Sequence, residues 1–244
     1  MNPSRRLLLC LFVIAAAPAA PACGQAPRFA LTPLLFESDT KYLYSNAGIN
    51  TAGRIVEVVS GVPFERFVEE RLLRPLGMVD TTFWPDEDRL KRLAKSYRPK
   101  SDATAPSLEE TPIRTLRYPL SNRAARHPMP AGGYFSTAAD VARFCRMLLG
   151  GGELEGRRVL SEDAVRQMAS RQTPPELKES YGLGFTVNGS SFGHGGAHAT
   201  DMTIDPNTGL ATVWMVQHVG FPGDGATAIT VFKKAVAEAF ARPE

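Results

Sequence analysis

The sequence is poor in cysteine, nearly balanced in charge and short of long apolar runs. Only 3 of its 244 residues are cysteines, and Cys10 and Cys23 lie in or beside an N-terminal leader, which excludes a disulfide framework. The 28 Lys+Arg against 25 Asp+Glu give a net charge of +3, which excludes the basic footprint of a nucleic-acid-binding protein. With 43% hydrophobic residues the chain is not disordered, so we expect one globular domain, or two small ones, stabilised by an apolar core.

The first 22 residues have the pattern of a signal peptide. Arg5 and Arg6 precede an apolar run over 7–17 that is too short to span a bilayer, and Ala20-Pro21-Ala22 is a small-residue cleavage site. We therefore expect export to the periplasm or the extracellular space, by the Sec or the twin-arginine route, with no stable membrane span. Residues 23–39 contain prolines without periodicity and predict an irregular segment.

Helical spacing appears next in the sequence. Apolar residues recur on one face over 47–60, and Gly61 provides a stop. A second helix begins at Pro63 and is expected to end at Arg74-Pro75, because proline disfavours a helical conformation for the residue before it. Residues 84–130 are rich in charge, proline and serine with little periodicity, which predicts a long surface loop without a domain of its own.

The second half of the chain predicts helices followed by a sheet. Thr137 and Asp140 have capping-box spacing at the start of a helix that ends in three glycines, and another helix starts at Ser161. The period then changes to two, with strands over 181–187, 190–195, 202–205 and 210–218 joined by short turns. A closing helix over 227–240 has an apolar stripe suited to one sheet face. The pattern predicts an α+β fold, with an antiparallel sheet covered by a C-terminal helix and a separate helical region.

Two short motifs are candidates for chemistry. Tyr44-Ser45-Asn46 stands before a helix, and His194-Gly195-Gly196 stands on a strand. Alone each is ambiguous, because a tyrosine before a helix usually packs and a histidine followed by glycines usually marks a strand end or bulge. Together they belong to an ordered series: Tyr-Ser-Asn-Ala-Gly (44–48), Val-Ser-Gly (59–61), Arg-Pro-Leu-Gly-Met-Val-Asp-Thr-Thr (74–82), Ala-Gly-Gly-Tyr-Phe-Ser-Thr-Ala-Ala-Asp (131–140), Tyr-Gly-Leu-Gly-Phe (181–185) and Gly-His-Gly-Gly-Ala (193–197).

This series resembles the serine β-lactamase-related family, which includes class C β-lactamases, penicillin-binding D-peptidases and related esterases. The resemblance covers the chain from about residue 40 to its end. It implies a β-lactamase/transpeptidase-like fold, with residues 40–244 as a partial domain. It also implies a serine hydrolase that works without a cofactor or metal on a small molecule or peptide with an amide, ester or lactam carbonyl.

The resemblance also implies a role for each motif residue. Tyr44 matches the tyrosine that carries the proton to and from the serine, and Asn46 matches the asparagine that hydrogen-bonds the substrate amide. His194 matches the first residue of the third motif, which sets the local field. Gly195 and Gly196 allow the substrate to lie against the strand, and the N–H of Ala197 completes the oxyanion hole.

The nucleophile of the family, a serine in a Ser-x-x-Lys helix, has one formal match, at Ser38-Asp39-Thr40-Lys41. This match lies on the same short segment as Tyr44, whereas the resemblance implies that the nucleophile approaches from a separate helix across the substrate. Asp39 and Thr40 are also poor helix formers. We therefore expect Ser38 not to be the nucleophile, and the N-terminal strands and serine helix of the family to be missing. A sheet without those strands has an exposed edge, which predicts marginal stability or a homodimer through that edge.

Two other patterns have simpler explanations. Residues 189–193 satisfy Gly-x-Ser-x-Gly, but that nucleophile motif must turn from a strand into a helix, and an Asn188-Gly189 hairpin accounts for it. His194, His198 and His218 could together hold zinc, but no HExxH helix accompanies them. Two functions remain open: an acyl-enzyme hydrolase, or a catalytically inactive relative that binds cell-envelope peptides or arises from a truncated gene model.

Overall fold

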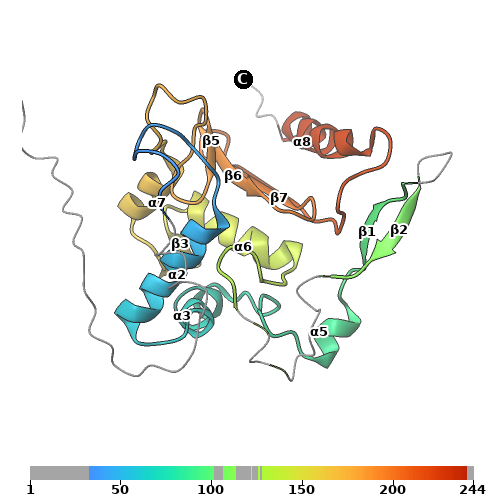
Figure 1. Ribbon diagram of the computed structural model, residues 1–244, viewed down its shortest axis with the longest axis horizontal. Helices are drawn as coiled ribbons and strands as arrows, with labels where there is room; N and C mark the ends of the chain where they lie inside the picture. The colour runs from blue at the N-terminus through green and yellow to red at the C-terminus, as the bar shows by residue number, and fades with distance from the viewer. Residues whose placement is uncertain (1–32, 102–106, 114–121, 123–125, 127, 241–244) are drawn as a thin grey trace, which may run out of the picture.

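The computed structural model describes residues 33–101, 107–113, 122, 126 and 128–240. The predicted signal peptide and the first part of the irregular segment after it lie outside these residues. The described chain has an α+β fold in which an antiparallel sheet lies between helices (Figure 1), as the sequence pattern predicts. Within the described residues, no helix is both long and apolar enough to span a membrane.

The main sheet has four strands in the order β5-β6-β7-β8, each antiparallel to its neighbour. The turn between the first two strands is Gly189-Ser190, one residue later than the predicted Asn188-Gly189 turn, because Asn188 still pairs with Ser191. Gly189 has the positive φ of 60° that this tight turn requires. The register places His194 opposite Met202 and Ile204 opposite Ala211. The strands are β5 (Thr186–Asn188), β6 (Ser191–Gly195), β7 (Asp201–Asp205) and β8 (Leu210–Trp214).

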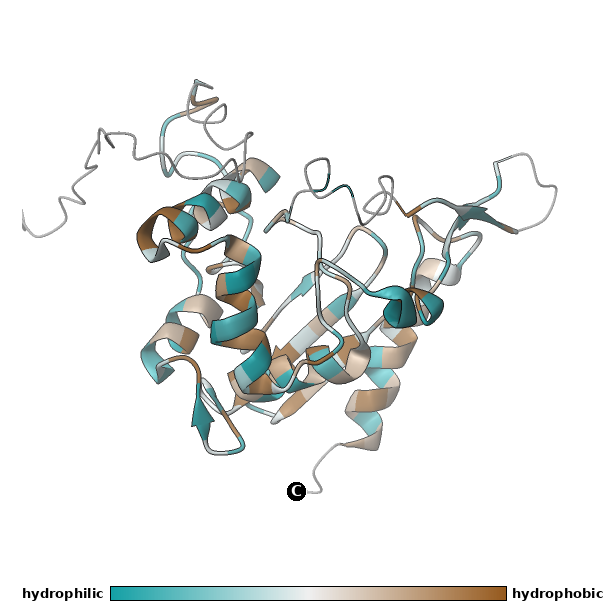
Figure 2. Ribbon diagram, turned by 90° about the horizontal axis from the view of Figure 1, so that it is seen from below, coloured by the Kyte–Doolittle hydropathy of each residue, from teal (hydrophilic) through white to brown (hydrophobic). Residues whose placement is uncertain are grey.

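Helices cover the two faces of this sheet. Successive side chains of a strand point to opposite faces, so Ile204 and Val213 face helix α6 (Ala138–Leu149) and join the core there. On the other face, the rings of Trp214 and Phe232 are 5.2 Å apart, which places α8 (Ala228–Ala239) against β8. Figure 2 shows hydrophobic residues on the central strands and the helices beside them. β8 is an outer strand of the described sheet, so this sheet has an edge of the kind that the predicted dimer requires. The dimer itself stays a prediction.

The helical region begins with α2 (Asn46–Ser60), which starts and stops where the sequence indicates. The Ser45 hydroxyl accepts a hydrogen bond from the Gly48 N–H at 3.3 Å, and Gly61 ends the helix with a φ of 73°. Thr137 caps α6 and Ser161 caps α7 (Glu162–Ala169) in the same way, with hydrogen bonds of 3.2 and 3.1 Å. These caps confirm the predicted helix starts, because capping depends on local sequence alone.

The second predicted helix ends at Leu76, one residue beyond the expected Arg74-Pro75 end. It runs from α3 (Phe64–Val68) through a π-helical turn (Glu69–Leu73) into α4 (Arg74–Leu76). Pro75 follows the π-helical turn directly, where the Arg74 N–H bonds to the Glu69 carbonyl five residues back instead of four. Gly77 caps this end of the helix, and its φ of 65° is left-handed.

The region predicted as a long loop, 84–130, also contains regular structure. It holds helix α5 (Glu87–Lys91), which is mostly hydrophilic in Figure 2, and a hairpin of β1 (Ser96–Pro99) and β2 (Leu108–Thr111). Ion pairs across the hairpin join Lys95 to Glu110 at 2.8 Å and Arg98 to Glu109 at 2.6 Å. The charges that suggested a loop are therefore cross-strand partners.

The predicted strands 181–187 and 210–218 are shorter in the structure. Tyr181 makes only an isolated bridge to Thr186, because Gly184 with a φ of 89° interrupts the strand before β5. Beyond Trp214 the chain leaves the sheet, and His218 instead forms a bridge to Tyr97. A third small hairpin, β3 (Glu153–Leu154) with β4 (Arg157–Arg158), follows α6.

Candidate active site

The structure brings together the two motifs that the sequence singles out. Tyr44 ends the segment before α2 and His194 lies on β6, and their ring centroids are 5.8 Å apart. Tyr44 is 49% exposed, so the pair lies open to solvent. The side chains of a tyrosine and a histidine from distant parts of the chain therefore line one surface that a ligand can reach.

Asn46 is the first residue of α2 and is exposed beside Tyr44. The helix start is fixed by the Ser45 cap and, one turn later, by Asn50, which is 8% exposed and accepts the Ala131 N–H on Oδ1 at 3.1 Å. This second contact ties α2 to the 131–133 segment. Sequence reasoning did not single out Asn50, because its partner lies far away in the chain.

After His194 the chain makes a tight turn that shapes the other side of the site. The Gly196 N–H donates to the Thr200 carbonyl at 2.7 Å, and the Ala199 N–H donates to the Gly196 carbonyl at 3.0 Å. Gly195, Gly196 and Ala197 are all exposed. Among the described residues the Ala197 N–H has no acceptor, so it is available to a ligand oxygen.

The imidazole of His194 is oriented by the backbone carbonyl of the next residue, Gly195. Its Nδ1 lies 2.5 Å from the Gly195 carbonyl oxygen, an acceptor that requires the proton on Nδ1 when the ring is neutral. The Nε2 atom then carries the lone pair and can accept a proton or a hydrogen bond. The turn that displays Ala197 thus also sets the tautomer of the histidine.

The Ser38-x-x-Lys41 match does not form a helix. Thr40 N–H bonds back to the Glu37 carbonyl at 3.3 Å, and Asp39 adopts a φ of 65°, so residues 37–40 form an exposed turn. Neither the Ser38 hydroxyl nor the Lys41 ammonium hydrogen-bonds another described residue. The arrangement lacks the serine–lysine contact and the helix N-terminus that activate such a nucleophile.

Two tyrosines that the sequence did not assign to the site lie beside it. The Tyr181 ring is 6.3 Å from His194 in an edge-to-face arrangement and 5.3 Å from Tyr42. In the sequence, Tyr181 could be linked to the site only through its place in the ordered Tyr-Gly-Leu-Gly-Phe block. Tyr42 could be linked to it only because it lies two residues before Tyr44. Neither signal shows that the two rings meet.

Burial raises the pKa of Tyr181 to about 12, and the neighbouring phenols of Tyr42 and Tyr44 add to the rise. The folded protein therefore favours the neutral phenol, and the stability that this group contributes is lost as pH rises from about 10 to about 12. We expect the alkaline difference in phenolate absorbance between wild type and Tyr181→Phe to have its midpoint near pH 12. A midpoint near pH 10, the ordinary value for tyrosine, would contradict this environment.

Two of the three histidines of the metal alternative are neighbours, because the His218 N–H donates to the His198 carbonyl at 3.2 Å. His198 Nδ1 lies 3.3 Å from the hydroxyl of the buried Ser96, and the ring of His218 stacks on Phe221 at 4.9 Å. His194 instead contacts Tyr44 and Tyr181. Within the described part of the chain, no three His, Cys, Asp or Glu residues are grouped so as to hold a metal ion. The Gly-x-Ser-x-Gly match at 189–193 is the β5–β6 hairpin, so it does not form a nucleophile turn into a helix.

The chain belongs to the β-lactamase family, because the model of that family, described as Beta-lactamase, matches residues 26–236. It is 33% identical over 230 residues to an uncharacterized protein of Mycobacterium tuberculosis, a match that covers 80% of this chain and 54% of that protein. It is 27% identical over 212 residues to a protein of Escherichia coli O157:H7 named "Putative D-alanyl-D-alanine carboxypeptidase", covering 75% of this chain and 46% of the relative. The chain thus spans about half the length of these relatives.

Solved structures agree on the fold. A mutant of simvastatin synthase from Aspergillus terreus superposes with a TM-score of 0.73 at 22% identity, covering 89% of this chain and 59% of that one. An octameric penicillin-binding protein homologue from Pyrococcus abyssi gives a TM-score of 0.61 at 20% identity, covering 82% and 44%. The β-lactamase/transpeptidase-like fold predicted from the motifs is confirmed, and with it membership of this serine hydrolase family.

Proposed function

We propose that Tyr44, Asn46, His194 and the turn after it form the substrate-binding and proton-transfer part of a β-lactamase-type hydrolase site. Its ligands are small molecules or peptides with an amide, ester or lactam carbonyl. The observation that carries the proposal is the 5.8 Å contact between the rings of Tyr44 and His194, which joins two distant motifs on one exposed surface.

Each group has a chemical task in this proposal. The Ala197 N–H donates to the carbonyl oxygen of the ligand, and the Asn46 amide bonds the ligand amide. The Nε2 atom of His194 and the hydroxyl of Tyr44 exchange protons with the ligand or with an attacking oxygen. Gly195 and Gly196 leave room for the ligand to lie along the end of β6, since both are exposed and carry no side chain.

Ser38 does not act as the nucleophile in this proposal, because it lies on an exposed turn without contact to Lys41. Turnover by the acyl-enzyme route then requires a serine that the described residues do not bring to the site. The second function, a catalytically inactive relative that binds cell-envelope peptides, would use the same Tyr44, Asn46 and His194 surface for binding alone. The predicted signal peptide supports the location this requires, outside the cytoplasm.

The test measures, by calorimetry, the equilibrium binding of N-acetyl-D-alanyl-D-alanine to the purified protein. We expect His194→Ala and Asn46→Ala each to weaken binding roughly tenfold, the effect of losing about one good hydrogen bond. Asn207→Ala, which alters an exposed asparagine in the β7–β8 turn, is the matched control and should bind as wild type. Wild-type affinity in both site variants, or no binding to the folded wild-type protein, would refute the proposal.

A further inference from the structure

The turn that follows His194 contains a residue in a strained conformation. Ala199 has a φ of 60°, in the left-handed region that a residue with a Cβ rarely adopts. Such a conformation persists only where the surrounding structure holds it in place. The segments packed against this turn therefore take part in shaping it.

His198 is the residue through which two other segments hold the turn. Its backbone carbonyl accepts the His218 N–H at 3.2 Å. Its ring Nδ1 and the Ser96 hydroxyl lie 3.3 Å apart and form a hydrogen bond. Ser96 is 1% exposed, so water does not compete for this contact. Because His198 directly follows Ala197, and consecutive Cα atoms are about 3.8 Å apart, the two anchors limit where the Ala197 N–H can point.

Ser96 has a fixed place because the β1–β2 hairpin is bonded to the chain that leaves β8. The Tyr97 N–H donates to the Gln217 carbonyl at 2.9 Å, and the Val219 N–H donates to the Tyr97 carbonyl at 2.7 Å. These two bonds flank His218, whose own N–H holds the turn. The hairpin, the chain after β8 and the turn thus form a closed circuit of hydrogen bonds.

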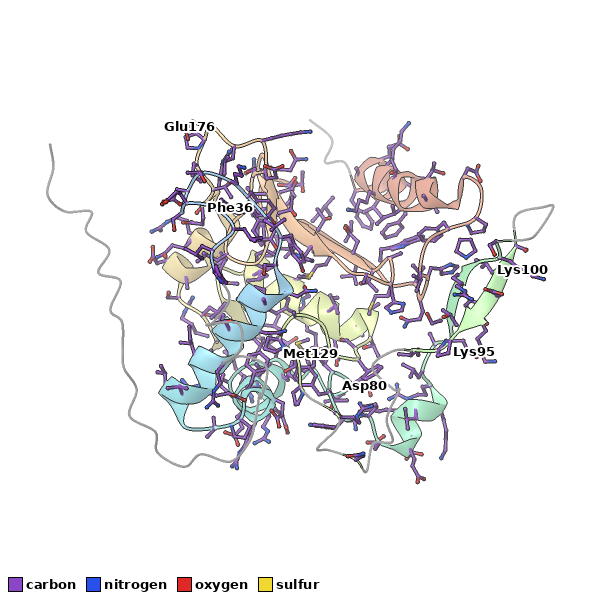
Figure 3. The ribbon with its side chains drawn as sticks, viewed as in Figure 1. Phe36, Asp80, Lys95, Lys100, Met129 and Glu176 are labelled. Atoms are coloured by element: carbon purple, nitrogen blue, oxygen red, sulfur yellow. The ribbon has the colours of Figure 1, made fainter. Side chains whose placement is uncertain are left out.

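The β1–β2 hairpin lies outside the main sheet and forms a two-stranded sheet of its own. Figure 3 labels Lys95 and Lys100, which precede and follow β1 and mark where the hairpin stands. Ser96 and His198 are 102 residues apart in the sequence. Local folding of the turn does not require a contact over this distance, so its role can be tested by removing it.

We propose that Ser96 and His198 are positioning residues, which hold the turn so that the Ala197 N–H faces the carbonyl oxygen of the ligand. Ser96 acts through His198, because its buried side chain is not accessible to a ligand. The inference rests on the proposed carbonyl site for the ligand and on the contacts above for the geometry of the turn. A hydrogen bond weakens steeply when its donor is misaligned. Loss of the Ser96–His198 contact therefore weakens ligand binding without removing a group that touches the ligand.

The test measures two properties of the full chain labelled with ¹⁵N: the Ala197 amide NMR signal without ligand, and the affinity for N-acetyl-D-alanyl-D-alanine. Ser96→Ala is expected to shift the Ala197 signal and to weaken binding about five- to tenfold, the effect of one misaligned hydrogen bond. Ser190→Ala is the matched control. It removes a hydroxyl that donates to Asp205 at 2.9 Å, at the opposite end of β6, and should leave both properties at their wild-type values.

Variants of His198 separate positioning from a general loss of stability. His198→Asn keeps a side-chain hydrogen-bonding group near the place of Nδ1 and should bind the dipeptide within about twofold of wild type. His198→Ala should lose as much affinity as Ser96→Ala. The double variant of Ser96→Ala with His198→Ala should lose no more than the larger single loss, because both changes remove the same contact.

Three results would overturn the inference: an unmoved Ala197 signal in both alanine variants, wild-type affinity in both, or additive losses in the double variant. Where Ser96→Ala does not fold, His198→Ala decides, because His198 is only half-buried. Failure of the folded wild-type protein to bind the dipeptide would refute the carbonyl site alone. The Ala197 signal, measured without ligand, would then still decide whether the hairpin holds the turn.

Discussion

Ile204→Ala is expected to lower the free energy of unfolding by about 2–5 kcal/mol. Ile204 lies on the inner strand β7 and is fully buried. It stands opposite Phe192 on β6 and Ala211 on β8. The substitution removes three buried carbon atoms and leaves a cavity that the flanking strands cannot close without losing their register. Urea unfolding followed by circular dichroism measures the change.

The control for this prediction is Ile55→Ala. Ile55 lies on α2 and is 58% exposed, so the same chemical change removes little buried surface there. Its effect should stay within about 0.5 kcal/mol, the usual range for surface substitutions. Equal losses for Ile204→Ala and Ile55→Ala would mean that the sheet does not form the core against α6.

Gly196→Ala is expected to weaken ligand binding roughly 5- to 150-fold, which corresponds to about 1–3 kcal/mol of overpacking strain. A methyl group at this position would overlap Thr200 Oγ1, in the turn that the Gly196–Thr200 hydrogen bond closes. The overlap is relieved by rotation of the Thr200 side chain or by a shift of the turn. The expected loss of affinity follows from a shift of the turn, which moves the Ala197 N–H away from the position from which it meets a ligand oxygen.

Removing the Thr200 hydroxyl tests this explanation directly. The double variant Gly196→Ala with Thr200→Ala lacks the overlapping atom and should recover most of the wild-type affinity for N-acetyl-D-alanyl-D-alanine. Additive losses in the double variant would show that the overlap is not the cause. Calorimetry of the two single variants and the double variant completes the cycle.

The local elements of the fold were predictable because their signals are local. Ser45, Thr137 and Ser161 supply caps, and the Asn188-Gly189 pair predicts the β5–β6 hairpin to within one residue of its Gly189-Ser190 turn. The β1–β2 hairpin was not predicted because a charged sequence without periodicity is typical of a solvated loop. Its carboxylates form ion pairs with cations on the opposite strand, and the sequence does not show this pairing. The π-helical turn was not predicted because a single turn with i→i+5 hydrogen bonds barely changes the spacing of apolar residues along the helix.

The candidate site was only half predictable. Tyr44 and His194 were found through the ordered motifs, and the structure places their rings together. Tyr42 and Tyr181 were not found, because a tyrosine in sequence gives no sign of which ring it will meet. The same is true of Thr200, which closes the turn after His194 through a backbone carbonyl. Contacts of this kind arise from tertiary structure, so sequence periodicity carries no record of them.

The central claim is a β-lactamase-type ligand site at Tyr44 and His194 that does not use Ser38 as its nucleophile. The most direct measurement is the intact mass of the folded protein before and after incubation with benzylpenicillin and, separately, with a fluorophosphonate. The account predicts no stoichiometric adduct with either reagent on a protein that binds N-acetyl-D-alanyl-D-alanine reversibly. A stoichiometric adduct that maps to Ser38 and disappears in Ser38→Ala would contradict it and would assign the serine hydrolase activity to that turn.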